Sequence, residues 1–217
     1  MKQPILLLLY IGCHLAATAQ NWNGVQKSVF NERKKGDKLG YAVAMHGNYA
    51  IAGAYWDNLD ASGNDSMLSA GAAHIFYNNG TEWVWQQKLV AADRSSIDFF
   101  GEAVAIYGDY ALVAATGDSK NMYGVSDSSY PAGAVYLFKR TGNVWSQTYK
   151  ITAPKNERWW DDNYGNSIAL NQTHVVVGTY KTAYNGSLPP VLLSGPGAAY
   201  VYRFSGDTLI YEQPLYA

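Results

Sequence analysis

Three segments of this chain repeat one another at a regular interval, and this repetition constrains the fold more than any other feature. Residues 39–54 (LGYAVAMHGNYAIAGA) recur as residues 100–115 (FGEAVAIYGDYALVAA) and residues 164–179 (YGNSIALNQTHVVVGT). One glycine marker lies at Gly40, Gly101 and Gly165, and a second, which opens GAAHIF, GAVYLF and GAAYVY, lies at Gly71, Gly133 and Gly197. Because both markers keep nearly the same period, the sequence predicts three copies of one structural unit.

Each copy predicts four short strands joined in series. Gly47-Asn48 and Gly108-Asp109 separate two apolar runs, and glycine followed by Asn or Asp is typical of a two-residue hairpin turn. Gln172-Thr173 takes this place in the third copy. A second hairpin turn is predicted in every copy, at Asn79-Gly80, Gly142-Asn143 and Gly206-Asp207. A four-stranded antiparallel sheet that repeats along one chain is typical of the blades of a β-propeller.

We therefore predict an all-β fold of three four-stranded antiparallel β-propeller blades, at about residues 39–90, 100–152 and 164–217. One further strand is predicted at residues 22–30, ahead of the first blade. Complete propellers typically have about four to eight blades, so these elements predict a partial propeller. Further blades would come from a longer chain or from self-association.

The N-terminus predicts a secretory signal peptide over residues 1–19, followed by the repeat region at residues 20–217. Lys2 precedes a short apolar run, and Ala17-Thr18-Ala19 forms a small-x-small cleavage site. Lipid anchoring through Cys13, which follows a glycine, is the alternative. Either interpretation predicts a secreted or cell-surface protein, and cleavage would leave no transmembrane segment.

The charge and motif content argue against several function classes. The formal net charge is −1, so the chain lacks the basic surface that nucleic-acid binding requires. The sequence contains neither a clear nucleophile–histidine–acid set nor a metal-binding spacing such as HExxH. Cys13 is the only cysteine and would leave with the signal peptide, so stability must come from packing.

The repeats resemble the FG-GAP family, in particular its bacterial branch, and the N-terminal propeller of integrin α chains. Phe100-Gly101 matches the aromatic–glycine element of that family, and Gly53-Ala54 matches its Gly-Ala element. The resemblance covers residues 22–216 and implies propeller blades. Integrin-type repeats carry an Asp-rich calcium loop between the two elements, whereas here a turn such as Gly108-Asp109 closes the gap. Because two residues cannot supply the ligands of calcium, we expect no cofactor at these turns.

Long, divergent segments all fall between the second and third strands or between blades, which places them at one end of the predicted sheets. Variable loops on a rigid scaffold commonly form a binding surface. The candidate binding residues in these loops are Trp159, Trp160, Asp161, Tyr55, Trp56 and Asp57. Their tryptophans would stack on a sugar ring or on an aromatic side chain of a partner, although packing against a neighbouring blade would also explain them.

Two sets of aspartates leave alternatives open. Asp57, Asp60 and Asp65 in the first long loop predict either solvated loop polarity or a weak calcium site. Asp37, Asp98 and Asp162 each precede the first glycine marker by three residues. They predict either an Asx-type cap at the entry to each blade or a ring of carboxylates that holds a cation.

Three functions fit the sequence. The first is a secreted or cell-surface adhesion module that binds a protein or glycan with its long loops. The second is a carbohydrate-active lyase or hydrolase that uses loop carboxylates such as Asp161 or Asp57. The third is a structural repeat region of a longer surface protein.

Overall fold

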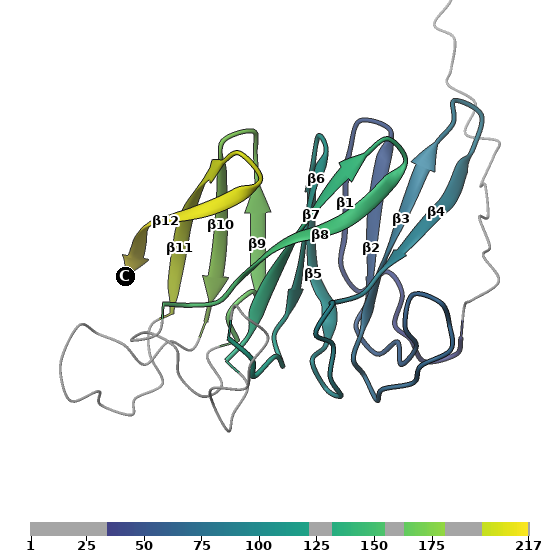
Figure 1. The fold of residues 1–217 in the computed structure, drawn as a ribbon, viewed down its shortest axis with the longest axis horizontal. Helices are drawn as coiled ribbons and strands as arrows, with labels where there is room; N and C mark the ends of the chain where they lie inside the picture. The colour runs from purple at the N-terminus through teal and green to yellow at the C-terminus, as the bar shows by residue number, and fades with distance from the viewer. Residues whose placement is uncertain (1–33, 122–131, 155–162, 181–196, 217) are drawn as a thin grey trace, which may run out of the picture.

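The computed structural model describes residues 34–121, 132–154, 163–180 and 197–216, which form three four-stranded antiparallel sheets (Figure 1). Sheet 1 contains β1 (Val43–His46), β2 (Tyr49–Ala54), β3 (Ala72–Asn78) and β4 (Trp83–Leu89). Sheet 2 contains β5 (Phe100–Tyr107), β6 (Tyr110–Ala115), β7 (Ala134–Thr141) and β8 (Val144–Ile151). Sheet 3 contains β9 (Ser167–Leu170), β10 (His174–Thr179), β11 (Ala198–Ser205) and β12 (Thr208–Tyr216). The predicted all-β fold with three four-stranded propeller-type blades is confirmed.

The sheets lie side by side in chain order and do not close into a ring within the described residues (Figure 1). Tight turns join the strands at one end of every sheet, and the long connections gather at the opposite end (Figure 1). The predicted hairpin turn at Gly108-Asp109 is confirmed, because Tyr107 and Tyr110 face each other across it. The strand predicted at residues 22–30 and the signal peptide lie outside the described residues.

Each sheet carries a bulge at the same place, between its third and fourth strands. The register shifts between Ile75 and Phe76 in sheet 1, between Leu137 and Phe138 in sheet 2, and between Val201 and Tyr202 in sheet 3. A bulge increases the local twist of a strand, so the outer strand of each sheet turns in the same way. The three sheets are therefore copies of one unit in detail as well as in strand order.

Apolar packing between neighbouring sheets forms the core. At the first junction, between sheets 1 and 2, Val104 and Ile106 of β5 pack against Ile51 and Ile75. At the second junction, between sheets 2 and 3, Val175 and Val177 of β10 pack in one cluster with apolar residues of sheet 2. The aromatic residue of the repeat marker is fully buried at both junctions, as Phe100 and as Tyr164. Their rings lie 5.4 Å from that of Tyr136 and 5.5 Å from that of Tyr200, respectively.

The repeated glycines are explained by the close approach of the sheets. Gly101 has a φ of +97°, and a Cβ atom there would lie 2.2 Å from the carbonyl oxygen of Ala72 in the neighbouring sheet. Gly40 holds the same place in sheet 1 with a φ of +87°, but nothing lies within 4 Å of its Cβ position. The glycine marker is therefore required for two reasons, the positive φ and the close approach of a neighbouring sheet. In sheet 1 only the positive φ requires it.

Sheet 1 leaves uncovered the face that sheet 2 buries. Val43 and Met45 of β1 are 71% and 65% exposed, whereas their counterparts in β5, Val104 and Ile106, are 8% and 6% exposed. Leu39, at the position of the buried Phe100, is also exposed. This face of sheet 1 carries the apolar side chains of a junction, but no other sheet of the described residues covers it.

Candidate functional site

A patch of exposed aromatic and aliphatic side chains lies at the long-loop end of sheet 1. Tyr41 is 58% exposed and Trp56 is 44% exposed. Leu39, Leu68 and Ile97 in the neighbouring loops are exposed as well. Large apolar side chains that gather at a protein surface commonly mark a binding site. We call these five residues, together with Tyr55, the loop-end patch.

Ring contacts hold the aromatic members of the loop-end patch together. Tyr55 lies at the centre, with its ring centroid 4.4 Å from that of Tyr41 and 5.6 Å from that of Trp56. Phe99, from the connection between sheets 1 and 2, lies edge-on to Tyr55 at 6.0 Å. The Lys38 ammonium lies 4.8 Å from the centroid of the Trp56 ring, which is a cation–π contact. The predicted candidates Tyr55 and Trp56 are thus brought together with residues of two other loops.

The loop that carries Trp56 is held by hydrogen bonds along its length. Leu59 and Ser66 form an isolated antiparallel bridge, which makes residues 55–70 a short arm. Arg94 clamps this arm from the next connection, since its guanidinium donates to the carbonyl oxygen of Asn58 at 2.8 Å and to the Asp65 carboxylate at 3.2 Å. A surface fixed in this way loses little conformational entropy when a partner binds.

Asp57, predicted as a surface binding residue, is buried inside sheet 1. Its carboxylate forms an ion pair with Lys88 Nζ at 2.8 Å and accepts a hydrogen bond from the Leu59 amide at 2.8 Å. The Nε2 atom of His74 lies 3.8 Å away. Burial alone would raise the pKa of Asp57, but hydrogen bonds from His74, Lys88 and the Leu59 amide outweigh it and hold the pKa below its usual value.

The three aspartates of the first long loop do not form a shared site. The Asp60 carboxylate accepts hydrogen bonds from the Ser62 and Asn64 amides of its own turn. The hydrogen bonds from the Asn64 amide and from the Ser62 hydroxyl are the main causes that lower the pKa of Asp60 to about 2. Asp65 pairs with Arg94, and Asp57 pairs with Lys88. Within the part of the chain that the structure describes, no three His, Cys, Asp or Glu side chains are grouped so as to hold a metal ion.

The pattern of the FG-GAP repeat matches three successive stretches of the sequence, residues 22–76, 83–138 and 145–202. The chain belongs to the FG-GAP repeat family. The second of these FG-GAP repeats runs from β4 through β5 and β6 to β7, so it begins with the last strand of one sheet and ends in the next. One sequence repeat of this kind therefore includes strands from both sides of a junction between neighbouring sheets. A comparison with curated proteins gives no match.

The FG-GAP aspartates that precede the glycine marker act as caps in both copies that the structure describes. The Asp37 carboxylate accepts a hydrogen bond from the Lys34 amide at 3.0 Å, and that of Asp98 accepts one from the Ser95 amide at 2.6 Å. The two backbone carbonyl groups also accept equivalent hydrogen bonds, from the amides of Trp56 and Gly117. Each carboxylate thus closes the turn before its blade with an amide three residues earlier, which supports a local structural role, whereas an Asx turn would bond an amide that follows. Asp162 lies outside the described residues.

The second FG-GAP blade contains a buried ionic network at the first junction. Lys150 Nζ lies 2.8 Å from Asp118 and 2.7 Å from Asp93, and the single proton of the Tyr136 hydroxyl is shared between these two carboxylates. Asp118 and Lys150 hold the positions of Asp57 and Lys88 in sheet 1, so the buried pair is a repeated feature. The recurrence of an Asp and a Lys at the same repeat positions is the sequence signal for this pair.

Asp98 extends the same network. Its carboxylate lies 3.0 Å from Lys120 Nζ, which also approaches Asp118 at 3.5 Å. Burial and the nearby charge of Asp118 raise the pKa of Asp98 to about 6, although Lys120 and the Ser95 amide act in the opposite direction. The network therefore links Asp98, which precedes sheet 2, to Lys120 and Asp118 in the loop after β6, and it contains one carboxyl group whose pKa is raised to about 6.

The remaining candidates are resolved only in part. Trp159, Trp160 and Asp161 lie outside the described residues, so their predicted binding role stays a prediction. Sequence reasoning missed Tyr41, Leu68 and Ile97. Nothing in the sequence marks Ile97. In the structure it is marked by its backbone, because this β-branched residue has a φ of +68°, which is unusual outside glycine. Within the described residues, no helix is long and apolar enough to cross a bilayer.

Proposed function

We propose that this FG-GAP chain is a secreted or cell-surface binding module that adheres to a protein or glycan through the loop-end patch. The observation that carries the proposal is the contact between Tyr41, Tyr55 and Trp56, three aromatic side chains drawn from two loops and partly exposed to solvent. Tyrosine and tryptophan are enriched at binding hot spots because their rings offer a large, rigid and amphipathic surface. Lys38 adds a positive charge at the edge of the patch.

The carboxyl groups of Asp57, Asp65 and Asp98 favour binding over acid–base catalysis as the role of these loops. A general acid needs a raised pKa and access to substrate. Asp57 is buried and its pKa is lowered, and Asp65 is paired with Arg94. Asp98 has a raised pKa, but its carboxylate is buried against Lys120. These groups stabilise the loops that present the aromatic patch.

Binding of the full chain to a glycan array and to an array of extracellular proteins would test this function. Trp56→Ala should reduce the signal of any bound glycan or protein at least tenfold, which corresponds to about 1.4 kcal/mol. Val144→Ala is the control, because Val144 is also an exposed apolar residue but lies by the tight turn between β7 and β8, at the opposite end of the sheets. An array signal that survives Trp56→Ala, or no signal for the unmodified chain on either array, would contradict the proposal.

We also propose that the open face of sheet 1 receives a further propeller blade, from a second copy or from a longer chain. Val43 and Met45 support this proposal, because their counterparts in sheet 2 are buried by a neighbouring sheet. Light scattering of the purified chain, before and after Met45→Glu, would test self-association. A concentration-dependent mass that Met45→Glu abolishes would identify a second copy. A stable, well-behaved monomer at all concentrations would count against both sources of the further blade.

A further inference from the structure

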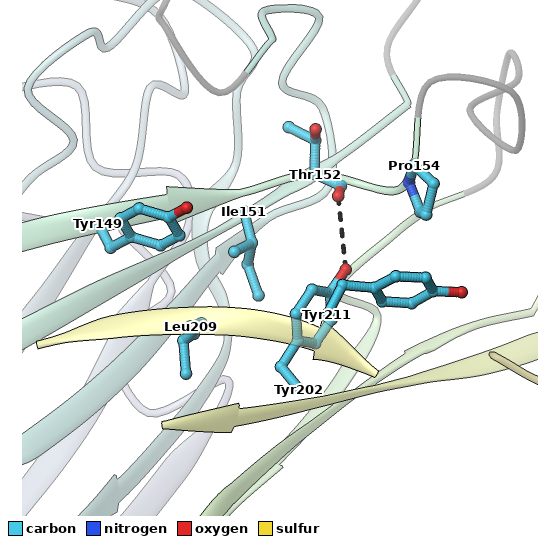
Figure 2. Close-up of a pocket in the computed structure, with 7 residues that line it drawn as sticks. All are labelled: Tyr149, Ile151, Thr152, Pro154, Tyr202, Leu209 and Tyr211. Atoms are coloured by element: carbon cyan, nitrogen blue, oxygen red, sulfur yellow. Dashed lines mark hydrogen bonds between the residues drawn. The ribbon is translucent and has the colours of Figure 1, made fainter. Parts of the chain in front are cut away.

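A cavity of about 250 Å³ opens at the second junction, between the outer strand of sheet 2 and the outer strands of sheet 3 (Figure 2). Tyr149 and Ile151 of β8 lie on one side of it, and Leu209 and Tyr211 of β12 lie on the other. Pro154, just beyond β8, lies at one end, on the side toward which the Tyr211 ring extends (Figure 2). The cavity is remote from the loop-end patch, which belongs to sheet 1 and the connection that follows it.

The equivalent place at the first junction is closed by hydrogen bonds. The side-chain amide of Gln87 donates to the carbonyl oxygen of Trp145 at 2.7 Å and accepts from its amide N–H at 2.8 Å. The Ala92 amide donates to the side-chain carbonyl of Gln147 at 2.9 Å. Four residues thus join the outer strands β4 and β8 across the first junction.

At the second junction, the residues that hold the repeat positions of these four all belong to the lining of the cavity. Tyr149 stands opposite Leu137 as Gln87 stands opposite Ile75 in sheet 1. By the same register, Leu209 replaces Trp145 and Tyr211 replaces Gln147. Pro154 replaces Ala92 and has no amide hydrogen to donate. The second junction therefore lacks the two glutamine side chains and the backbone amide hydrogen of Ala92. Tyr149 and Tyr211 replace the two glutamines.

The internal contacts of the cavity hold its walls in position. The Tyr202 hydroxyl accepts a hydrogen bond from Tyr164 at 2.6 Å and donates a long one to the Thr152 carbonyl oxygen at 3.5 Å. The ring of Tyr211 lies 5.5 Å from that of Tyr202. Tyr149 is half-buried and Tyr211 is partly exposed, so a ligand can reach both rings from solvent.

The lining indicates the chemistry of a ligand. The described residues that surround the cavity are tyrosine, isoleucine, threonine, proline and leucine, with no charged group and no side-chain amide. A sugar would require several polar side chains to match its hydroxyl groups, whereas this lining offers aromatic walls with a few hydroxyl groups. The volume is slightly below the range of about 300–1,000 Å³ that is typical of pockets for whole small-molecule ligands, so it suits one or two side chains of a longer ligand.

We propose that this cavity binds an uncharged, proline-rich peptide segment in the polyproline II conformation. Proline rings fit between aromatic walls, and the polyproline II backbone has no internal hydrogen bonds, so one of its carbonyl groups can accept from the Tyr149 hydroxyl. The conformation is formed before binding, which lowers the entropic cost for a shallow site. The partner is a second protein that carries such a segment.

Two-dimensional NMR of the full chain with an acetylated, amidated octaproline peptide would test this site. The peptide should shift the resonances of Tyr149, Ile151 and Tyr211, and a Gly-Ser octapeptide should not. Tyr149→Gln, which restores the residue type of the first junction, should weaken octaproline binding at least tenfold. Tyr77→Gln, at a half-buried tyrosine of sheet 1 outside the cavity, should leave the affinity unchanged.

Tyr149→Phe keeps the ring and removes only the hydroxyl, so it tests the site without a change in packing, and a severalfold loss of affinity is expected. Octaproline shifts confined to the loop-end patch would overturn the proposal, as would affinity that Tyr149→Gln leaves intact. Shifts of the cavity residues by cellohexaose but not by octaproline would assign the site to a glycan instead. The same shifts on concentration of the chain alone would identify a second copy as the occupant and overturn it too.

Discussion

The first and second junctions bury equivalent strands of the repeat, but different residue types connect the outer strands at each junction. At the first junction, Gln87 joins β4 to β8 through the backbone of Trp145, and Lys150 pairs with the buried Asp118 and the partly exposed Asp93. At the second junction, Tyr149 takes the place of Gln87, and Pro214 of β12 takes the place of Lys150. A salt bridge between Lys139 and Asp207 links sheets 2 and 3, but both of its side chains are largely in contact with solvent.

This difference separates what the repeat must keep from what it can change. Both junctions keep a buried aromatic residue followed by a glycine, as Phe100-Gly101 and Tyr164-Gly165. The polar contacts at the outer edge are kept at one junction and lost at the other. Packing of the inner strands therefore defines the blade arrangement, whereas the outer edge is free to diverge and to acquire a cavity.

Gly101→Ala should have the largest effect, because it places a methyl group against the backbone of the neighbouring sheet. The Cβ atom would lie 2.2 Å from the carbonyl oxygen of Ala72, and the positive φ adds strain. We expect a loss of more than about 4 kcal/mol in the free energy of unfolding, from strain and overpacking together. Soluble yield and urea unfolding would measure this loss.

Gly40→Ala is the matched control for Gly101→Ala. It has a similar φ of +87° but an open Cβ position, so the expected cost is about 1–2 kcal/mol. Equal losses for the two variants would show that the glycine marker serves the backbone alone and that the sheets do not meet at Gly101.

Lys150→Met should destabilise the first junction by about 3–5 kcal/mol, since it leaves Asp118 and Asp93 without their shared partner in a buried site. Lys139→Met removes the solvent-screened pair that links sheets 2 and 3 and should have a much smaller effect than Lys150→Met. Urea unfolding of both variants would compare them. A small effect of Lys150→Met would mean that the first junction does not depend on its ionic network.

Asp98→Asn should change the pH dependence of stability. The pKa of Asp98 in the folded chain is about 6, above its value of 3.8 in an unfolded chain, so the folded state binds the proton more tightly. This group therefore stabilises the fold at acid pH, and its contribution is lost as the pH rises from about 4 to about 6. At about 1.4 kcal/mol per pKa unit, the change is at most about 3 kcal/mol.

The readout is the difference in unfolding free energy between Asp98→Asn and the unmodified chain, measured by urea at several pH values. The stability of the variant relative to the unmodified chain should rise across the same pH window. Asp37→Asn is the comparison variant: Asp37 holds the same repeat position and its pKa is also raised, but it is only half-buried, so the difference should rise in the same direction. A flat difference for Asp98→Asn would contradict the assignment.

The periodic part of the fold could be predicted from the sequence, because repeated glycines and turns mark it directly. The two-residue turn at Gly108-Asp109 and the gathering of the long loops at one end follow from local backbone chemistry. The bulges could not be predicted, since no residue type marks the shift at Ile75 and Phe76. The burial of Asp57 was also missed, because its partner Lys88 lies far along the chain and the pair is visible only when two repeats are compared.

The candidate sites could likewise be predicted from the sequence only in part. Tyr55 and Trp56 could be selected as exposed aromatic loop residues, but their contacts with Tyr41 and Phe99 depend on tertiary structure. The cavity at Tyr149 had a weaker signal, a tyrosine where the preceding repeat has Gln87. Departures from the repeat, rather than the repeat itself, mark the places where one junction differs from the other.

Gln87→Leu gives the smallest expected effect and the sharpest comparison of the two junctions. The leucine would leave the amide and carbonyl groups of the buried Trp145 without their side-chain partner, which should cost about 2 kcal/mol. The reciprocal change, Tyr149→Gln, should shift the free energy of unfolding by less than about 1 kcal/mol, because new amide contacts would offset the lost burial of the ring. Urea midpoints with unchanged slopes would measure both variants. If Gln87→Leu costs no more than Tyr149→Gln, the amide bridge contributes little, and the two junctions are held by inner-strand packing alone.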